Sequence, residues 1–453
     1  MNQLADHVTG PVLAPHDERY DAERTGWQIA RRHRPDLVVG AVRPADVQAA
    51  VTYASARGLP VAVQGTGHAA AAVAGTSGVL ITTARMSAVR VDADAGTARV
   101  AAGTRWDQVV RAAAPAGLAP LSGSAPHVGA VSYTLGGGLG LLSRTFGYAA
   151  DHVRGLDVVT ADGRLRHVGP DREPDLFWAL RGGRDNFGVV TAMEIDLMPV
   201  TTVYGGALVF PVETAADVFG TYLRWAATVP DAMNSSIALI ALPNSPAIPA
   251  PLRGRRSVHV RIACTVGDPA AGERLVAPLR ALGPSIDTLG ALAYQDAGSI
   301  HDEPAEPAAV ESDTALLGDL DDHAVRAILD RISLDAAVPH VVELRQLGGR
   351  LAHQPAVANA VGNRDARYLL NLVSRLAGTD TGPARSAHTG LLDALAPWST
   401  GGRFLNFMNG ADAASQVRSA YSAADHRRLT GIKAVHDPQN VFRLNHNIPP
   451  TQN

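Results

Sequence analysis

The spacing of hydrophobic residues changes along the chain, and each kind of spacing predicts a different kind of element. Between Pro35 and Pro199, short alternating runs bounded by glycine, proline or aspartate predict strands. Residues 47–58 and 104–117 repeat apolar residues every three or four positions, which predicts helices that each end at a glycine. Thr104 suits the N-cap of the second helix. The predicted strands of this region are 59–64, 78–83, 88–92, 97–103, 155–162 and 189–198.

From about Val200 to Asn409, longer helical runs alternate with strands. This pattern predicts a second α+β unit, in which a sheet carries helices on one face. The helices are expected at 214–229, 270–282 and 321–332, and the strands at 235–242, 258–266, 341–347 and 367–376. The acidic, proline-containing segment 299–316 predicts a surface loop, and a long helix is expected over about 415–435.

Composition and charge exclude several classes of protein. The chain has 453 residues, of which 46% are hydrophobic and 18% charged, as is ordinary for a folded protein of two or three domains. A net charge of −3 offers no electrostatic footprint for nucleic acid or for an anionic membrane surface. The heavy use of alanine, arginine and glycine with little lysine indicates a GC-rich bacterial source.

The single cysteine and the N-terminal residues bear on disulfide bonds, metal binding and the expected location of the protein. Cys264 is the sole cysteine, so the sequence excludes an intramolecular disulfide and a cysteine-based metal cluster. The N-terminal residues lack the basic start and apolar core of a secretory signal. No run approaches the ~18 apolar residues that a membrane helix needs. The simplest interpretation is a cytoplasmic protein.

Glycine is concentrated in three segments, 64–75, 122–147 and 181–191. Glycine lets backbone N–H groups come close to a pyrophosphate and adopt the positive φ that an anion-binding loop requires. Tight turns alone would explain one such segment. Three of them within about 130 residues favour a bound cofactor over turns alone.

A nicotinamide cofactor is one alternative, because Gly65, Gly67 and Ala70 fit G-x-G-x-x-A after a strand. The dinucleotide fold, however, needs a crossover helix after this loop, and here another short strand follows. Asp92, near the expected place for a ribose-binding acid, falls in a two-stranded meander. The sequence therefore disfavours this alternative.

His68 stands inside the first glycine-rich segment, directly after Gly67. A loop histidine is usually a surface or packing residue. Here the small neighbours would let a planar ring system approach, and an imidazole nitrogen can attack an electrophilic cofactor methyl group. Spacing alone leaves both interpretations open.

Four segments in this order resemble the FAD-linked oxidases of the vanillyl-alcohol oxidase/p-cresol methylhydroxylase superfamily, specifically the berberine bridge enzyme-like branch. They are 31–68, which ends in GTGH, 128–153, 174–191 and 428–448. Each segment is moderately specific, and together they extend over nearly the whole chain.

The resemblance implies a two-domain α+β fold of the p-cresol methylhydroxylase (PCMH) type. Residues 1–199 would form the FAD-binding domain, 200–409 the substrate-binding domain, and 410–453 a C-terminal segment that completes the discontinuous flavin domain. In relatives the loop histidine is bonded to the flavin 8α-methyl group, and His68 occupies that position. The other positions that match FAD-wrapping segments are Gln64, Gly65, Thr66, Gly67, Ala69, Ala70, Val128, Gly129, Gly136, Gly137, Gly138, Gly140, Gly188, Val190 and Asn445.

The chain departs from the family pattern at the second attachment point. Many relatives attach FAD a second time, through a cysteine in G-x-C-P-x-V-G, but this chain reads GSAPHVG with Ala125 in that place. Covalent attachment is therefore expected through His68 alone, as in a mono-covalent bacterial type. Val128 matches a position near the flavin face that oxygen approaches, and its small size implies an oxidase.

The catalytic base is the second departure. Relatives often carry NYxRL on the C-terminal helix, and this chain reads DHRRL, with His426 at the tyrosine position and Asp425 at the asparagine. Histidine can act as a base at neutral pH, although His426 could equally face solvent. Tyr368, on a predicted strand, is the other catalytic candidate, and Tyr133 and Tyr148 could also reach the cavity.

The resemblance thus implies an FAD-dependent oxidase that takes a hydride from a small organic substrate and reduces O2 to H2O2. In bacteria such enzymes often modify secondary metabolites. Two rivals remain open: an oxygenating or cyclising flavoenzyme, and a non-redox ring-forming or binding scaffold in which the flavin is structural or absent. Fold alone does not decide between them.

Overall fold

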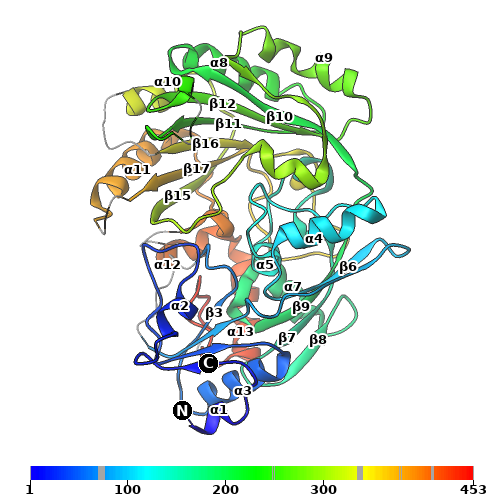
Figure 1. The fold of residues 1–453 in the computed structure, drawn as a ribbon, viewed down its shortest axis with the longest axis vertical. Helices are drawn as coiled ribbons and strands as arrows, with labels where there is room; N and C mark the ends of the chain where they lie inside the picture. The colour runs from blue at the N-terminus through cyan, green and yellow to red at the C-terminus, as the bar shows by residue number, and fades with distance from the viewer. Residues whose placement is uncertain are drawn as a thin grey trace.

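The computed structural model describes residues 2–69, 77–246, 248, 250–333, 340–376, 378, 380–409 and 413–451. Within these residues the chain forms three sheets with helices around them, and the α+β fold expected from the sequence is confirmed. The molecule has an upper half built on the largest sheet and a lower half that contains the other two sheets and both ends of the chain (Figure 1).

The first sheet lies at the lower end of the molecule (Figure 1). Its strands, in the order β1-β2-β4-β3, are β1 (Val12–Leu13), β2 (Leu37–Gly40), β3 (Val61–Gln64) and β4 (Val79–Thr82). β2 and β3 both pair parallel to β4, so a crossover must connect them, and helix α3 (Pro44–Ser55) provides it. The residues that α3 buries are spaced as a core-facing helix requires, namely Val47, Ala50, Val51 and Ala54.

The second sheet is antiparallel and has the order β5-β6-β9-β7-β8. Its strands are β5 (Val89–Asp92), β6 (Thr97–Ala101), β7 (Val153–Val159), β8 (Leu165–Val168) and β9 (Val189–Asp196). Helices α4 (Trp106–Ala113), α5 (Ala130–Leu135) and α7 (Pro174–Gly183) share its hydrophobic core. The N-cap of α4 is Arg105 rather than the predicted Thr104, because the buried Thr104 hydroxyl donates instead to the Ala88 carbonyl oxygen at 3.2 Å.

The third sheet has eight strands, in the order β13-β10-β12-β11-β16-β17-β15 with β14 also paired to β10. They are β10 (Thr202–Pro211), β11 (Met233–Ala241), β12 (Arg256–Cys264), β13 (Ile286–Asp287), β14 (Gly290–Ala293), β15 (Val310–Leu317), β16 (Val341–Gln346) and β17 (Tyr368–Arg375). The expectation of a surface loop over 299–316 is wrong for its second half, which is strand β15. Glu311 of this strand is buried because it pairs with Arg31, 280 positions earlier in the chain, at 3.0 Å.

The two faces of the third sheet have different partners. Helices α8 (Ala215–Ala226), α9 (Pro269–Arg280), α10 (Asp322–Ser333) and α11 (Gly382–Ala394) lie along its upper and outer side (Figure 1). Alternate strand residues such as Val260, Leu344 and Leu370 form a core with these helices. Side chains at the positions in between point to the opposite face of the sheet, because side chains alternate along a strand. This second face is turned towards the lower half of the molecule.

The end of the chain returns to the first two sheets. The predicted helix over 415–435 is interrupted, because Ser422 caps a new helix with its Oγ, which accepts from the Asp425 backbone N–H at 3.0 Å. The result is a short α12 (Ala413–Gln416) and a longer α13 (Ala423–His436). Leu429 of α13 packs into the core of the second sheet, and the Val441 carbonyl oxygen accepts from Val61 N–H at the edge of the first sheet, at 2.9 Å.

Several short helices complete the fold. They are α1 (Asn2–Ala5), α2 (Tyr20–Arg24) and α6 (Ser143–Phe146), together with the 3-10 helices η2 (Ala114–Ala116), η3 (Ala149–His152), η4 (Arg184–Asn186), η5 (Val212–Thr214), η6 (Ala250–Leu252), η7 (Tyr294–Ile300), η8 (Gly349–Ala352), η9 (Ala396–Trp398), η10 (Leu405–Phe407) and η11 (Val417–Ala420). Within the described ranges, every helix is too short or too polar to cross a bilayer.

Buried neutral histidines make the stability depend on pH. Burial lowers the pKa of His388 to about 4, and burial together with nearby Arg184 lowers the pKa of His446 to about 3. Because these groups bind protons more readily when unfolded, their contribution to the free energy of unfolding is complete above about pH 6.5. It is lost as the pH falls through about 4 for His388 and about 3 for His446. We expect the calorimetric unfolding temperature to fall steadily between pH 7 and pH 5.

His446→Gln removes one such group and should flatten this fall, whereas His16→Gln, on an exposed side chain, should leave it unchanged. If the unfolding temperature fell equally steeply with pH in the wild type and in His446→Gln, His446 would not contribute to the pH dependence of stability.

Candidate active site

The loop that follows β3 is held by a segment from the start of the chain. Trp27 N–H donates to the Thr66 carbonyl oxygen at 2.9 Å, and Gln28 N–H donates to that of Gly67 at 3.2 Å. Gly67 has φ +74°, and a Cβ there would lie 2.5 Å from the Cα of Gly26. Two glycines are therefore needed where the segments cross, and the crossing fixes the loop that carries His68.

His68 is oriented by three neighbours. Its Nδ1 lies 2.8 Å from Thr66 Oγ1, which also accepts from Gly129 N–H at 3.2 Å. The Trp27 ring stacks on the imidazole with centroids 4.8 Å apart and planes 11° apart, and the His127 ring lies beside it at 5.1 Å. The structure thus brings together His68, Thr66 and Gly129, which the sequence singled out, with Trp27 and His127, which it did not.

The imidazole of His68 is neutral, and one of its nitrogens has no partner within the described ranges. Burial, together with the neighbouring His127 and the Arg105 guanidinium, lowers the pKa of His68 to about 3. Its Nε2 is buried and has no hydrogen-bond partner among the residues that the structure describes. An imidazole in this state keeps a nitrogen lone pair at neutral pH, as a nucleophile requires.

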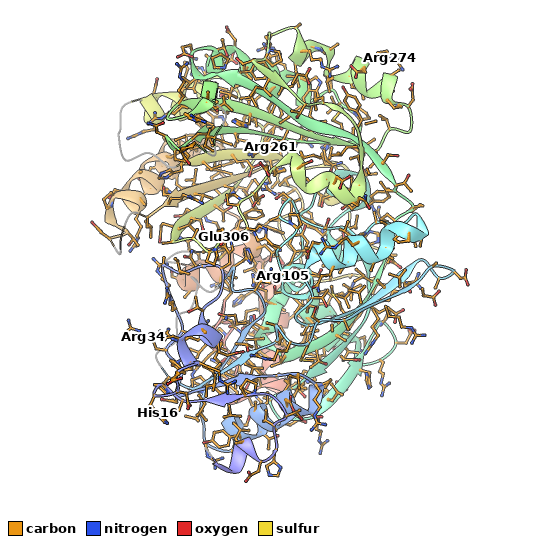
Figure 2. All side chains as sticks on the ribbon, viewed as in Figure 1. His16, Arg34, Arg105, Arg261, Arg274 and Glu306 are labelled. Carbon is orange, nitrogen blue, oxygen red and sulfur yellow. The ribbon has the colours of Figure 1, made fainter. Side chains whose placement is uncertain are left out.

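A cleft of about 1000 Å³ adjoins this histidine. Its lining comes from both halves of the molecule and includes Gln64, Gly65, Thr66, Trp27, His68, Arg105, His127 and Glu306. Arg105 and Glu306 are labelled near the middle of the view in Figure 2. The cleft has the size of a cofactor site. The part of the acidic segment 299–316 that precedes β15 therefore borders this cleft.

The residues present fit a flavin at this place. Besides His68 Nε2, two buried polar atoms of the cleft lining, Oε1 of Gln64 and Nε1 of Trp27, lack a hydrogen-bond partner within the described part of the chain. The buried Oδ1 of Asn445 lacks one too, but Asn445 is not among the residues that line this cleft. Buried polar atoms are normally paired, so unpaired ones beside a cleft indicate groups that a bound ligand satisfies. Of the predicted loop positions, Ala69 adjoins His68, and Ala70 lies outside the described residues.

The glycine run 136–140 is explained by contacts inside the protein. A Cβ on Gly136 would lie 1.8 Å from Asn406 Oδ1, and one on Gly140 would lie 2.1 Å from the Ser122 carbonyl oxygen. Gly137 and Gly138 have φ of +110° and +78°. The backbone therefore needs glycine here because Asn406 and the Ser122 backbone pack closely against it, and contact of these glycines with FAD remains a prediction.

The remaining predicted flavin positions lie at the second sheet and the end of the chain. Gly188 has φ +153°, and a Cβ there would lie 2.5 Å from the Val159 carbonyl oxygen. Val190 is buried in the second-sheet core, and Val128 packs against the same core. These three positions have structural roles of their own, and their contact with FAD is untested.

A buried polar cluster, which the sequence analysis missed, lies on the lower face of the third sheet. We call it the Glu343 cluster; its members are Glu343, Arg345, Arg261, Ser236 and Asn371. Strand register places Ser236 directly between Arg261 and Arg345, and Glu343 opposite Asn371. Arg261 is labelled on this sheet in Figure 2.

Glu343 is the centre of this cluster. It accepts from Arg345 Nε at 2.8 Å, Ser236 Oγ at 2.9 Å, and Arg261 Nη1 and Asn371 Nδ2 at 3.4 Å each. Burial alone would raise the pKa of Glu343, but Arg345, His301 and Arg261 hold it well below its usual range. Glu343 is therefore an ionised carboxylate that positions two guanidinium groups.

The Glu343 cluster is connected to the loop that carries Ala125. Arg345 Nη2 donates to Ser124 Oγ at 3.3 Å, and Ser124 Oγ donates to Glu303 Oε1 at 2.5 Å. The Arg345 guanidinium also lies over the Phe407 ring, 5.0 Å from its centroid. The polar face of the third sheet thus meets the second glycine-rich segment, at the junction of the two halves.

The predicted bases lie away from this junction. Tyr368 shares a sheet face with Leu370 and Leu372 and is buried in the helix-covered core, because side chains two positions apart point the same way. His426, on α13, is half-buried, and the centroid of the Tyr421 ring lies 6.3 Å from that of its imidazole. The arrangement argues against Tyr368 as the catalytic base and gives His426 no contact with the Glu343 cluster.

Tyr133 and Tyr148 are also accounted for by packing. Tyr133 stands edge-on to Trp106, at 5.5 Å, and Tyr148 stacks on Phe404, at 5.6 Å. Tyr148 is buried and Tyr133 is half-buried, and burial raises the pKa of each phenol. Neither is suited to act as a base near pH 7.

The sequence does contain a pattern that indicates the Glu343 cluster. In 341–347 and 258–266, charged residues occupy alternate positions between apolar ones, which marks one polar face of a strand. What the sequence could not supply was the register that places β12, β11 and β16 side by side. Because a shift of one residue would reverse every side chain, that register decides which residues form the site.

Comparisons with known proteins agree with this geometry. A family model described as FAD binding domain matches residues 35–169, and one described as Berberine and berberine like matches residues 404–449. The curated (R)-6-hydroxynicotine oxidase of Paenarthrobacter nicotinovorans is 28% identical over 98% of this chain and 97% of its own length.

Solved structures are similar over the whole chain. The 6-hydroxy-D-nicotine oxidase from Arthrobacter nicotinovorans aligns with a TM-score of 0.84 and 25% identity over 98% of both chains. A chitooligosaccharide oxidase aligns with a TM-score of 0.86 over 100% of this chain and 99% of its own, and at 18% identity it supports the fold alone.

Proposed function

This chain belongs to the berberine bridge enzyme-like FAD-linked oxidoreductases, and we propose that it is an oxidase that takes a hydride from a small organic molecule and passes the electrons to O2 to give H2O2. The observation that carries the proposal is the position of His68. It is a neutral, preoriented imidazole beside a cleft of cofactor size, and its Nε2 has no hydrogen-bond partner among the described residues. Ser124, in the same segment as its neighbour His127, is bonded to Arg345 of the separate polar face.

We propose that FAD is held covalently by His68 alone. Gln64, Thr66, Gly129 and Asn445 supply the polar groups around it, and the flavin, when bound, supplies the hydride acceptor. At the second attachment position the chain has the buried methyl group of Ala125, which cannot form a thioether. Cys264 is buried in the core of the third sheet, under its helices.

The Glu343 cluster is the proposed substrate-binding face. Arg345 and Arg261 keep donor groups on a buried surface at the junction of the halves, and Glu343 holds both guanidinium groups in place. Fixed donors in a water-poor site orient a substrate and stabilise charge that develops on it. The named activity of a relative, oxidation of 6-hydroxynicotine, makes an amine or alcohol C–H bond a suitable first substrate class to test.

Glu303 is the proposed proton acceptor. It belongs to the loop before β15, bonds to Ser124, and keeps 38% of its side chain exposed, so its second oxygen can reach a substrate. Glu343, in contrast, has its acceptor sites used by four donors. His426 remains the second candidate, on the strength of its position in the family pattern.

The test is anaerobic mixing of the holoenzyme with candidate amines and alcohols, followed by admission of O2. We expect a substrate to bleach the flavin absorbance, and O2 to restore it with one H2O2 per substrate oxidised. Glu303→Gln should slow the bleaching at least ~100-fold, since a general base contributes about 10²–10⁴-fold. His426→Ala, the matched variant, should bleach at nearly the wild-type rate.

Two outcomes would contradict the proposal. Substrate oxygenation with little H2O2 would make the protein a monooxygenase. If Glu303→Gln bleached at the wild-type rate and His426→Ala bleached slowly, the catalytic base would be His426 on α13 and not Glu303.

A further inference from the structure

A smaller cavity lies between the third sheet and the second glycine-rich segment. Its polar lining comprises Arg261 and Arg345 of the Glu343 cluster together with Ser143, Asn234, His301 and Gln346. The cavity has a volume of about 40 Å³. A water molecule needs roughly 10–15 Å³ of such volume, so the space holds about three atoms of that size, as many as the heavy atoms of a carboxylate group. The cavity therefore fits one small polar group of a larger ligand.

The side-chain acceptors around this cavity are already used within the protein. Asn234 Oδ1 accepts from Arg144 N–H at 2.7 Å, and Gln346 Oε1 accepts from Ser235 Oγ at 2.8 Å. Glu343, which both lining arginines contact, accepts from four donors. The lining therefore offers few side-chain acceptors to a ligand.

The donors around the cavity, in contrast, are in excess. Within the described part of the chain, the Arg261 side chain donates one hydrogen bond, from Nη1 to Glu343 at 3.4 Å, although a guanidinium carries five N–H donors. Ser143 Oγ accepts from Gly140 N–H at 2.7 Å, which leaves the hydrogen of this hydroxyl for another acceptor. A group that accepts hydrogen bonds is therefore the ligand that this lining favours.

The charge of Arg261 is also less well balanced than that of Arg345. Glu343 lies 2.8 Å from Arg345 Nε but 3.4 Å from Arg261 Nη1. Although burial opposes it, Glu343 and Glu303 raise the pKa of Arg345, whereas burial lowers the pKa of Arg261. Burial, with Arg261 and Arg345, lowers the pKa of His301 well below its ordinary value, so this imidazole is neutral. A carboxylate beside Arg261 would supply the missing negative charge.

We propose that this cavity binds a carboxylate group of the substrate, and that Arg261 is the residue that pairs with it. The inference rests on the proposed oxidase function and narrows its substrate class to an amine or alcohol that also carries a carboxylate. Arg345, which lines the cavity, donates to Ser124 at 3.3 Å, and Glu303, the proposed proton acceptor, accepts from the same serine. The rest of the molecule would then lie beside Ser124 and Glu303, at the junction of the two halves.

The oxidised holoenzyme can be titrated with benzoate and with benzamide, which have nearly the same shape and differ in charge. We expect benzoate to bind at least ~10-fold more tightly in calorimetry, because an ionised acceptor bonds more strongly to a guanidinium. We also expect benzoate to shift the flavin absorbance spectrum, because a substrate must lie within reach of the flavin. Equal affinities, or no binding of benzoate, would overturn the inference. Binding that left the flavin spectrum unchanged would indicate an anion site apart from the substrate and would overturn it too.

The role of Arg261 is tested with Arg261→Gln, which keeps a polar side chain and removes the charge. We expect this variant to bind benzoate at least ~10-fold more weakly and benzamide as before. Arg261→Lys keeps the charge and should recover part of the affinity for benzoate, and Arg111→Gln, at an exposed side chain of α4, should bind it as the wild type does.

Wild-type affinity for benzoate in a folded Arg261→Gln protein would overturn the inference. If Arg261→Gln does not fold, the comparison of benzoate with benzamide on the wild type decides. A holoenzyme that binds benzoate through Arg261, but whose flavin no carboxylate-bearing amine or alcohol bleaches, would contradict the proposed oxidase function and leave the carboxylate site in place.

Discussion

Glu343→Ala is expected to lower the free energy of unfolding by about 3–5 kcal/mol, because it removes the carboxylate from a buried ion pair and leaves Arg345 and Arg261 without it. The side chain of Glu343 is 2% exposed, and those of the two arginines are 13% and 11% exposed. Solvent can therefore do little to replace the lost partner. Denaturant unfolding of the wild type and the variant measures the difference.

The matched control is an exposed ion pair. Arg111 pairs with Asp107 one turn earlier on α4 and keeps 66% of its side chain exposed, so Arg111→Ala should change the free energy of unfolding by less than about 0.5 kcal/mol. If Glu343→Ala lowered the free energy of unfolding as little as Arg111→Ala, the Glu343 cluster would be solvated. It could then not be the dry, preoriented surface proposed to bind the substrate.

Most elements of the fold could be predicted from local patterns. The spacing in 47–58 corresponds to the buried face of α3, and the alternating runs 258–266 and 341–347 correspond to β12 and β16. These patterns are local consequences of burying one face. The segment 299–316 was interpreted wrongly because its strand half is stabilised by Arg31, a contact that no local pattern contains.

The site was predictable only in part, for the same reason. His68 and Thr66 lie in one short loop, so the sequence could place them together, and Gly129 was recognised through a motif. Trp27 and His127 come from other segments and meet His68 only in the folded chain. The orientation of Tyr368 could have been predicted. It lies two positions before the apolar Leu370 on one strand, so its side chain points to the same face of the sheet, towards the helices.

His68→Ala is expected to abolish covalent flavin completely, since alanine offers no nucleophile and Ala125 and the buried Cys264 offer no substitute. After acid precipitation the wild-type pellet should be yellow, and the variant should release all its flavin into the supernatant. His127→Ala is the matched control, because it removes the neighbouring imidazole and should keep flavin in the pellet. Flavin retained in the His68→Ala pellet would require another attachment residue.

The most direct test of a flavin anchored by His68 is the mass of the tryptic peptide 58–85 from the denatured wild-type holoenzyme. Our account predicts that this peptide is heavier by one covalently bound flavin, that fragmentation locates the added mass on His68, and that no other peptide carries it. An unmodified peptide 58–85, with the flavin free in solution or attached to another residue, would contradict it.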